Sequence, residues 1–175
     1  MVASMDLKTQ LIGKGVSESW FSSDEGLGFL KRQELQTEWI AFLSRFGFDA
    51  WFTVTYKTPA ASSILAIDRT QRVLRKAFKE IKTPLDAFIV SEQHRDGTYH
   101  SHGMLKLGAL SAEMERQLLR YLWDCTFHDS VCGRNSFSII RESDAVRRYV
   151  SKYLVKRPAD FRFLGFKGFG SEAKK

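Results

Sequence analysis

The sequence predicts an α+β fold in which helices pack on an antiparallel β-sheet. Segments with β character alternate along the chain with segments whose apolar residues recur at helical spacing. Only a few residues, around Asp96-Gly97, separate the second and third β segments, as expected for a hairpin. The resulting order is β-α-β-β-α-β with a further helix at each end, which is the order of the ferredoxin-like or RRM-like fold.

The first half of the chain supplies a helix, a strand and a long helix. Gly47 ends the first helix, on which large apolar residues recur three or four positions apart: Leu35, Trp39, Phe42 and Phe46. Residues 50–56 are predicted to form a strand because they include aromatic residues that favour β structure. The long helix starts after Pro59 and ends before Pro84. Its buried face carries Ile67, Leu74, Phe78 and Ile81, and its solvated face carries Arg72, Arg75, Lys76 and Lys79.

The middle of the chain supplies the hairpin and the next helix. Residues 87–90 form a short apolar run, which predicts a buried strand entering the hairpin, and residues 98–107 leave it. Ser111 is the predicted N-cap of a helix with one apolar face, formed by Met114, Leu118 and Leu122.

A fourth strand and a last helix complete the order. Phe137 and Ile139 alternate in the strand. Ser143 or Asp144 caps the helix, which ends at Arg157 before a proline.

Length and composition favour one folded domain. The chain has 175 residues, of which 43% are hydrophobic. We expect residues 1–28, rich in Ser, Gly and charge, to form a flexible N-terminal arm, and residues 29–175 to form a single domain. The net charge of +7 favours nucleic acid as a partner, or less strongly an anionic membrane surface.

The chain carries no obvious membrane span, signal peptide or disulfide framework. No apolar run approaches the length that a span requires. Cys125 and Cys132 are not spaced as a CxxC pair, and we expect reduced thiols in a cytoplasmic protein.

The hairpin brings two histidines and a carboxylate into one region. His100 and His102 are two residues apart on a strand, so their side chains share a face. With a two-residue loop, Glu92 would lie opposite Ser101 and face away from the imidazoles. With a three-residue loop, residues 95–97, Glu92 would lie opposite His100.

The three-residue loop is the one we expect. Such loops pair a type I turn with a glycine in the left-handed conformation, and Gly97 stands at that position. Cross-strand Cβ atoms would then be about 5 Å apart, close enough for shared chelation.

Two imidazoles and a carboxylate suit a divalent cation such as Mn²⁺ or Mg²⁺. We therefore predict Glu92, His100 and His102 as metal ligands; the alternative is two strand histidines that only pack or form hydrogen bonds. His94 is a possible fourth ligand, and we prefer to interpret it as an exposed residue beside the turn.

The last predicted helix carries two tyrosines and a basic surface. Tyr149 and Tyr153 are four residues apart and share a helix face, and Lys152 and Lys156 each follow a tyrosine by three residues. A nearby cation would stabilise a phenolate nucleophile, whose pKa is otherwise about 10. The alternative is a basic amphipathic helix whose tyrosines seal the edge of the core. The candidates for contacts with DNA phosphates are Arg147, Arg148, Lys156 and Arg157, and a solvated basic face accounts for them equally well.

These segments together resemble the HUH endonuclease superfamily, specifically the rolling-circle replication initiator (Rep) proteins. Residues 51–55, Trp-Phe-Thr-Val-Thr, resemble its first motif, and His100-Ser101-His102 resembles the HUH motif, with Ser101 where a bulky hydrophobic residue is usual. Glu92 falls where many Reps carry the third ligand, and residues 149–156 resemble the two-tyrosine form of the third motif. The resemblance covers roughly residues 50–157.

The resemblance implies the HUH endonuclease fold and a metal-dependent enzyme that nicks and joins single-stranded DNA through a 5′-phosphotyrosine intermediate. It implies Tyr149 as first nucleophile, Tyr153 as second, and Lys152 as an aid to phosphate chemistry. The implied partner is single-stranded or hairpin origin DNA of a plasmid or virus in the host cell. Gly13-Lys14-Gly15 does not form a Walker A motif, so the helicase and polymerase would come from the host.

Three other functions fit parts of the pattern: a single-tyrosine HUH transposase, a non-catalytic RRM-like nucleic-acid-binding module, and a metal hydrolase that uses water. The phenylalanine-rich segment 161–169 either stacks on bases or packs on the domain, and we favour packing.

Overall fold

The computed structural model describes residues 9–108, 110–130, 135–140, 154 and 160–166, and side chains are not described for residues 125–130. The named elements are η1 (Glu18–Ser22), α2 (Asp24–Ser44), β1 (Ala50–Val54), α3 (Ser63–Glu80), β2 (Asp86–Gln93), β3 (Tyr99–Lys106), α4 (Ala112–Ser130), β4 (Ser136–Ile139) and β5 (Phe161–Leu164).

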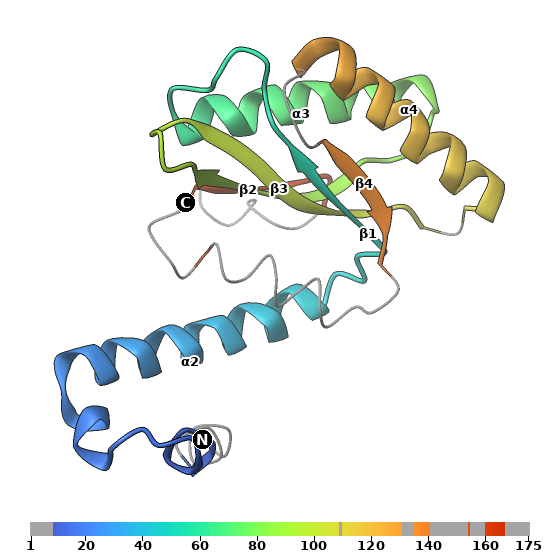
Figure 1. Cartoon of the computed structure of the whole chain (residues 1–175). Coiled ribbons are helices and arrows are strands. Elements are labelled where there is room, and N and C mark those ends of the chain that lie inside the picture. Colours follow the sequence, from blue (N-terminus) through green and yellow to red (C-terminus); the bar gives the residue numbers. More distant parts are fainter. Residues whose placement is uncertain (1–8, 109, 131–134, 141–153, 155–159, 167–175) are drawn as a thin grey trace, which may run out of the picture.

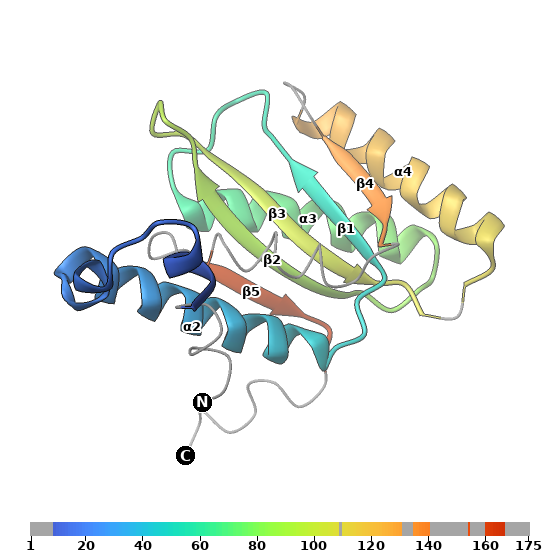
Figure 2. The same cartoon turned by 60° about the horizontal axis from the view of Figure 1, so that its bottom comes forward.

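The strands form one antiparallel sheet in the order β4-β1-β3-β2-β5 (Figure 1). The order of the first four strands, with helices linking β1 to β2 and β3 to β4, is the predicted ferredoxin-like order. Helices α3 and α4 lie side by side on one face of the sheet, here called the α3/α4 face, and α2 lies on the other, the α2 face (Figures 1 and 2). The predicted fold class is therefore confirmed, and the architecture is that of the HUH endonuclease fold.

The α3/α4 face holds the larger apolar core. Phe52, Ile89 and Leu105 point from the three central strands into this core and are fully buried. Helix α3 contributes the face that its spacing predicted, with Ile67, Leu74 and Phe78 buried and Ile81 packed at the edge, while the predicted basic residues are exposed.

Helix α4 confirms its predicted cap and corrects one residue of its predicted face. The Ser111 hydroxyl accepts a hydrogen bond from the backbone N–H of Met114 at 3.2 Å. Leu118 and Leu122 are buried, whereas Met114 is 50% exposed. Met114 lies in the first turn after the cap, so it shares the helical spacing of the apolar face without reaching the core.

The α2 face carries a cluster of aromatic rings over one end of the sheet. Its middle is formed by Leu43, Phe88, Val90 and Met104, and Phe163 of β5 stacks near Phe88 with ring centroids 4.8 Å apart. We call this the aromatic cluster; its remaining members are Trp39, Phe42, Phe46, Phe48, Ile140, Leu154 and Phe166.

Strand β5 is an element that the sequence did not predict. Residues 161–164 pair with residues 87–90 of β2, which makes β5 the outer strand beside α2 (Figure 2). Packing of this phenylalanine-rich segment on the domain is thereby confirmed for residues 161–166. The strand is only four residues long, too short for its alternation to stand out in the sequence.

The N-terminal region contains more helix than was expected. Ser23 caps α2 by accepting a hydrogen bond from the Gly26 N–H at 3.1 Å, so the helix begins before the expected boundary at residue 28. A Cβ at Gly26 would collide with the carbonyl oxygen of Trp20, so the close approach of η1 to α2 requires glycine. The division into an arm of residues 1–28 and a domain of residues 29–175 stays a prediction.

Within the described part of the chain, none of the helices combines the length and apolar character that a membrane crossing needs.

Candidate metal centre

The β2–β3 hairpin has the predicted three-residue loop. The His94 N–H donates to the Thr98 carbonyl at 2.7 Å, and the Gly97 N–H donates to the His94 carbonyl at 3.1 Å. Gly97 has φ +88°, a left-handed conformation that glycine adopts without strain. The Asp96 carboxylate accepts from the Thr98 N–H and hydroxyl, which closes the turn.

This loop fixes the register that the metal site needs. Glu92 pairs opposite His100, and Val90 pairs opposite His102. Because side chains alternate along a strand, Glu92, His100 and His102 all project from the α2 face, beyond the end of the aromatic cluster.

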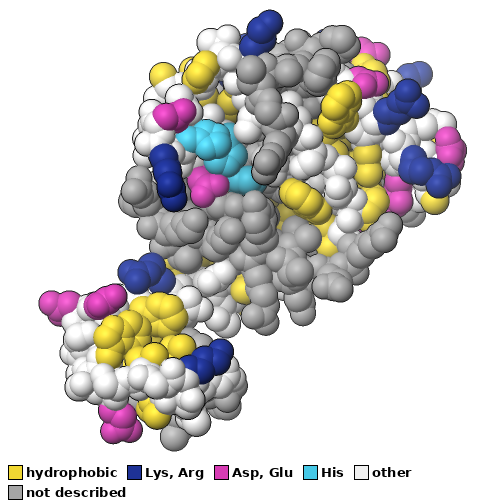
Figure 3. All heavy atoms as spheres, in the orientation of Figure 1, with side chains coloured by type: hydrophobic (Ala, Val, Ile, Leu, Met, Phe, Trp, Pro, Cys, Tyr) yellow, Lys and Arg dark blue, Asp and Glu magenta, His cyan; other side chains and the backbone are white. Residues whose placement is uncertain are grey.

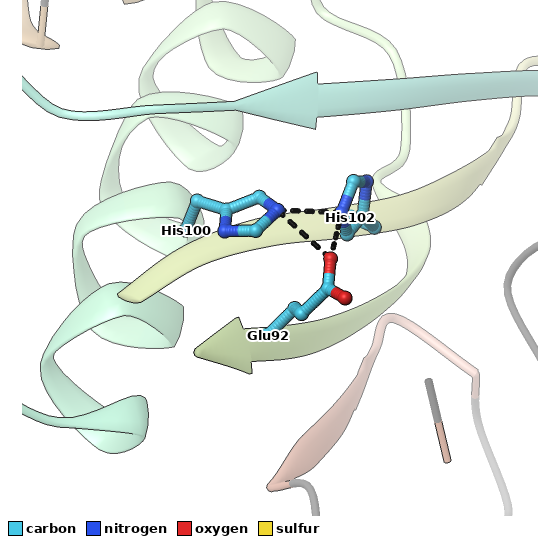
Figure 4. A group of neighbouring side chains, drawn as sticks. All are labelled: Glu92, His100 and His102. Atoms are coloured by element: carbon cyan, nitrogen blue, oxygen red, sulfur yellow. Dashed lines mark hydrogen bonds and ion pairs between the residues drawn. The ribbon is translucent and has the colours of Figure 1, made fainter. Parts of the chain in front are cut away.

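The three side chains converge on one point (Figure 4). The Nε2 atoms of His100 and His102 lie 3.1 and 3.2 Å from Oε2 of Glu92 and 2.8 Å from each other. They are the one group of three metal-ligating side chains found among the described residues. His100 and His102 are 6% and 3% exposed, while Glu92 is partly open to solvent. In Figure 3, histidine side chains gather beside an acidic one at the surface of the domain.

The spacing of the three donor atoms fits a small divalent cation. Adjacent ligands of an octahedral ion at about 2.1 Å would be about 3.0 Å apart, close to the three distances in this cluster. Two imidazole nitrogens and one carboxylate oxygen are a donor set for such ions, and three ligands leave positions for water or a phosphate oxygen. The geometry confirms the predicted grouping of Glu92, His100 and His102 as a potential metal site.

The electrostatics of His100 also favour a metal. Burial, assisted by the neighbouring His102 and His94, lowers the pKa of His100 to about 4, although Glu92 opposes this effect. The imidazole is therefore neutral at neutral pH, so its lone pair is available to a cation.

His94 does not join the cluster. It is exposed beside the turn, and its ring stacks on the His100 ring with centroids 4.0 Å apart. Our preferred interpretation, an exposed turn-flanking residue rather than a fourth ligand, agrees with this position.

Ser101 points to the opposite face of the sheet, as expected for the middle residue of the His-x-His pair. Its hydroxyl lies 2.8 Å from the Tyr56 hydroxyl, which also contacts the Ala66 carbonyl at 2.5 Å and the Thr70 hydroxyl at 2.6 Å. A serine fits here because this buried point of the α3/α4 face is polar.

Sequence reasoning missed one contact at the site. Nδ1 of His102 lies 2.9 Å from the hydroxyl oxygen of Thr53, which pairs directly opposite it on β1. The sequence shows Thr53 in a strand, but no local signal fixes the register between β1 and β3, which are far apart in the chain.

A cavity of about 910 Å³ opens beside His100, between the hairpin and the loop that follows β1. Thr53, Lys57, Arg95 and Tyr99 are among its lining residues. It provides room for a substrate next to the three ligands.

The predicted nucleophiles and phosphate contacts lie outside the described residues: Tyr149, Lys152, Tyr153, Arg147, Arg148, Lys156 and Arg157. The segment has one described member, Leu154, which is helical and packs against the aromatic cluster. Leu154 therefore lies on the α2 face, the face from which the three metal ligands project.

An antiparallel sheet with a His-x-His pair on one central strand and a glutamate on the next defines a protein of the HUH endonuclease class. Residues 49–158, more than half of the chain, match the family model described as replication-associated protein ORF2, and the chain belongs to this family. This confirms the resemblance to rolling-circle Rep proteins. Comparison with curated proteins and with solved structures gives no match.

Proposed function

We propose that this protein initiates rolling-circle replication by nicking and rejoining single-stranded DNA at an origin through a 5′-phosphotyrosine intermediate. The observation that carries the proposal is the convergence of Glu92, His100 and His102 within a chain of a replication-associated family.

Glu92, His100 and His102 would hold Mn²⁺ or Mg²⁺. The ion, when bound, supplies Lewis-acid polarisation of the scissile phosphate. The three side chains fix its position on the sheet, and burial of the histidines keeps them neutral and correctly oriented.

Tyr149 is the proposed first nucleophile. Its hydroxyl oxygen forms a bond to phosphorus, its proton is lost, and the bond from phosphorus to the 3′ oxygen breaks, so that the leaving strand ends in a 3′-hydroxyl. The phosphodiester energy is kept in the tyrosine ester, so attack by a 3′-hydroxyl rejoins the DNA. Tyr153 would carry out a second transfer. The packing of Leu154 on the α2 face supports this assignment.

Basic residues would hold the DNA. Lys152 would assist at the scissile phosphate, and the residues proposed to contact flanking phosphates are Arg147, Arg148, Lys156 and Arg157. The net charge of +7 supports a polyanionic partner. We propose single-stranded or hairpin origin DNA as that partner, with a host helicase and polymerase acting on the 3′ end in the host cytoplasm.

The direct test uses a pool of single-stranded oligonucleotides labelled at the 3′ end and incubated with the protein and Mn²⁺. The 3′ part of a cut strand stays on the tyrosine, so we expect a labelled protein that survives denaturant and disappears with chelator. Tyr149→Phe and His102→Ala should lose this adduct, and Tyr153→Phe should retain the first transfer.

Matched controls are Tyr121→Phe, a tyrosine packed against the α3/α4 core, and His94→Ala, an exposed histidine outside the cluster. Both should form the adduct. Adducts of parental yield in Tyr149→Phe, Tyr153→Phe and His102→Ala would overturn the proposed site. Cleavage without attached protein would indicate a hydrolase, and salt-sensitive binding without cleavage would indicate an RRM-like module. An obligate dimer that uses one tyrosine would favour a transposase.

A further inference from the structure

The two histidines of the cluster differ in what supports them from behind. Both present Nε2 to Glu92, so both have Nδ1 on the far side of the ring. Nδ1 of His102 lies 2.9 Å from the Thr53 hydroxyl. Nδ1 of His100 is buried and has no hydrogen-bond partner among the described residues.

The position of Thr53 follows from strand pairing. Thr53 lies on β1 directly opposite His102 on β3, and both side chains project from the α2 face. Threonine is β-branched, so its side chain has few rotamers, and its hydroxyl is held toward the imidazole by the same steric restriction that favours threonine in strands.

The hydrogen bond has a defined direction when the ring binds a cation. Coordination through Nε2 requires the lone pair on that atom, which leaves the proton on Nδ1 of His102. The Thr53 oxygen then accepts this N–H. Without a cation, His102 is free to carry its proton on Nε2 instead and donate it to Glu92, which lies 3.2 Å away. The threonine hydroxyl, which can donate or accept, satisfies Nδ1 in either case.

We infer that Thr53 is a positioning residue of the metal centre, which selects the metal-binding tautomer of His102 by accepting its Nδ1 proton. The inference rests on the metal role proposed above. Loss of the hydroxyl penalises the metal-bound state in particular, because only there must the buried Nδ1 keep its proton with no acceptor. Outer partners of this kind typically change metal affinity by about 10–100-fold.

The test is a calorimetric titration of the metal-free protein with Mn²⁺. Thr53→Val removes the hydroxyl and keeps the branched shape, and we expect its dissociation constant to rise about 10–100-fold. Thr53→Ser restores the hydroxyl and should bind close to the parental affinity. Ser138→Ala, which removes a hydroxyl from the same face of neighbouring β4, should bind as the parent does. The thermal midpoint of metal-free Thr53→Val should match that of the parent.

A spectroscopic readout separates tautomer selection from general damage. With Zn²⁺ as a diamagnetic probe, ¹⁵N spectra of the parent should show a slowly exchanging proton on Nδ1 of His102, and this protection should be lost in Thr53→Val. Equal Mn²⁺ affinity in the parent and Thr53→Val overturns the inference and leaves the proposed function standing. An equal loss in Thr53→Ser and Thr53→Val also overturns it. Failure of the parent to bind any Mn²⁺ overturns the metal centre and the inference together.

Discussion

The two faces of the sheet are made from the same strands and are put to different use. The α3/α4 face is covered by two helices, and along the central strands it is apolar apart from the buried contacts of Tyr56 with Ser101 and Thr70. The α2 face is divided: the aromatic cluster covers one end, and the two histidines with Glu92 occupy the other. One face therefore supplies stability, and the other combines packing with a chemically active end.

The alternation along β3 shows this division at the level of single residues. His100 and His102 project from the α2 face, while Ser101 and Gly103 between and beside them belong to the α3/α4 face. A Cβ at Gly103 would collide with the Phe88 carbonyl and with the Phe52 ring, so the strand that presents the ligands is pressed closely against the core beneath it. Rigid packing on one face thus holds the ligands of the other.

The largest effect on stability should come from the α3/α4 face. Phe52 is fully buried and stacks on Phe137 with ring centroids 5.7 Å apart. We expect Phe52→Ala to lower the free energy of unfolding by about 3–5 kcal/mol, since it leaves a large cavity. Phe163→Ala, on the partly exposed edge of the aromatic cluster, should cost less. Urea unfolding measures both, and an equal or larger loss for Phe163→Ala would contradict the proposed division of roles.

A metal-dependent change in stability should come from the α2 face alone. At a free Mn²⁺ concentration about 100 times the dissociation constant, binding should add about 2.7 kcal/mol to the free energy of unfolding. His102→Ala should lose most of this gain because it removes one of three ligands, whereas His94→Ala should keep it. Thermal unfolding with and without Mn²⁺ measures the difference. A gain of the same size in His102→Ala would place the ion elsewhere.

The smallest effect should come from Ser101→Ala, which tests whether the faces are independent. Its hydroxyl contacts Tyr56, and Tyr56 keeps its contacts with Ala66 and Thr70 when this partner is removed. We expect a loss of about 1 kcal/mol in unfolding free energy and no change in Mn²⁺ affinity. Urea unfolding and calorimetry report the two quantities. Weakened Mn²⁺ binding in Ser101→Ala would show that the two faces are coupled through the strand.

The same division explains what the sequence could predict. The order of the elements, the loop at residues 95–97 and the convergence of Glu92 with the two histidines followed from local signals: periodicity, a left-handed glycine and alternation along a strand. These signals lie within a few residues of the features that they determine.

The features that were missed depend on contacts between distant segments. Strand β5 exists because four residues near the end of the chain pair with β2, and Thr53 reaches His102 only through the register of β1 against β3. Met114 shares the spacing of buried neighbours, yet it is exposed because the core ends before the first turn of α4. Long-range register and the limits of a core are set by tertiary packing, which a single sequence does not display.

Peptide mapping of the DNA adduct by mass spectrometry tests the central claim most directly. The protein would be incubated with single-stranded DNA and either Mn²⁺ or chelator, and then digested with nuclease and protease. We predict a phosphodeoxynucleotide on the peptide that contains Tyr149, formed with Mn²⁺ and absent with chelator. Attachment that persists in chelator, or DNA cleaved with Mn²⁺ while every tyrosine remains unmodified, would contradict the account.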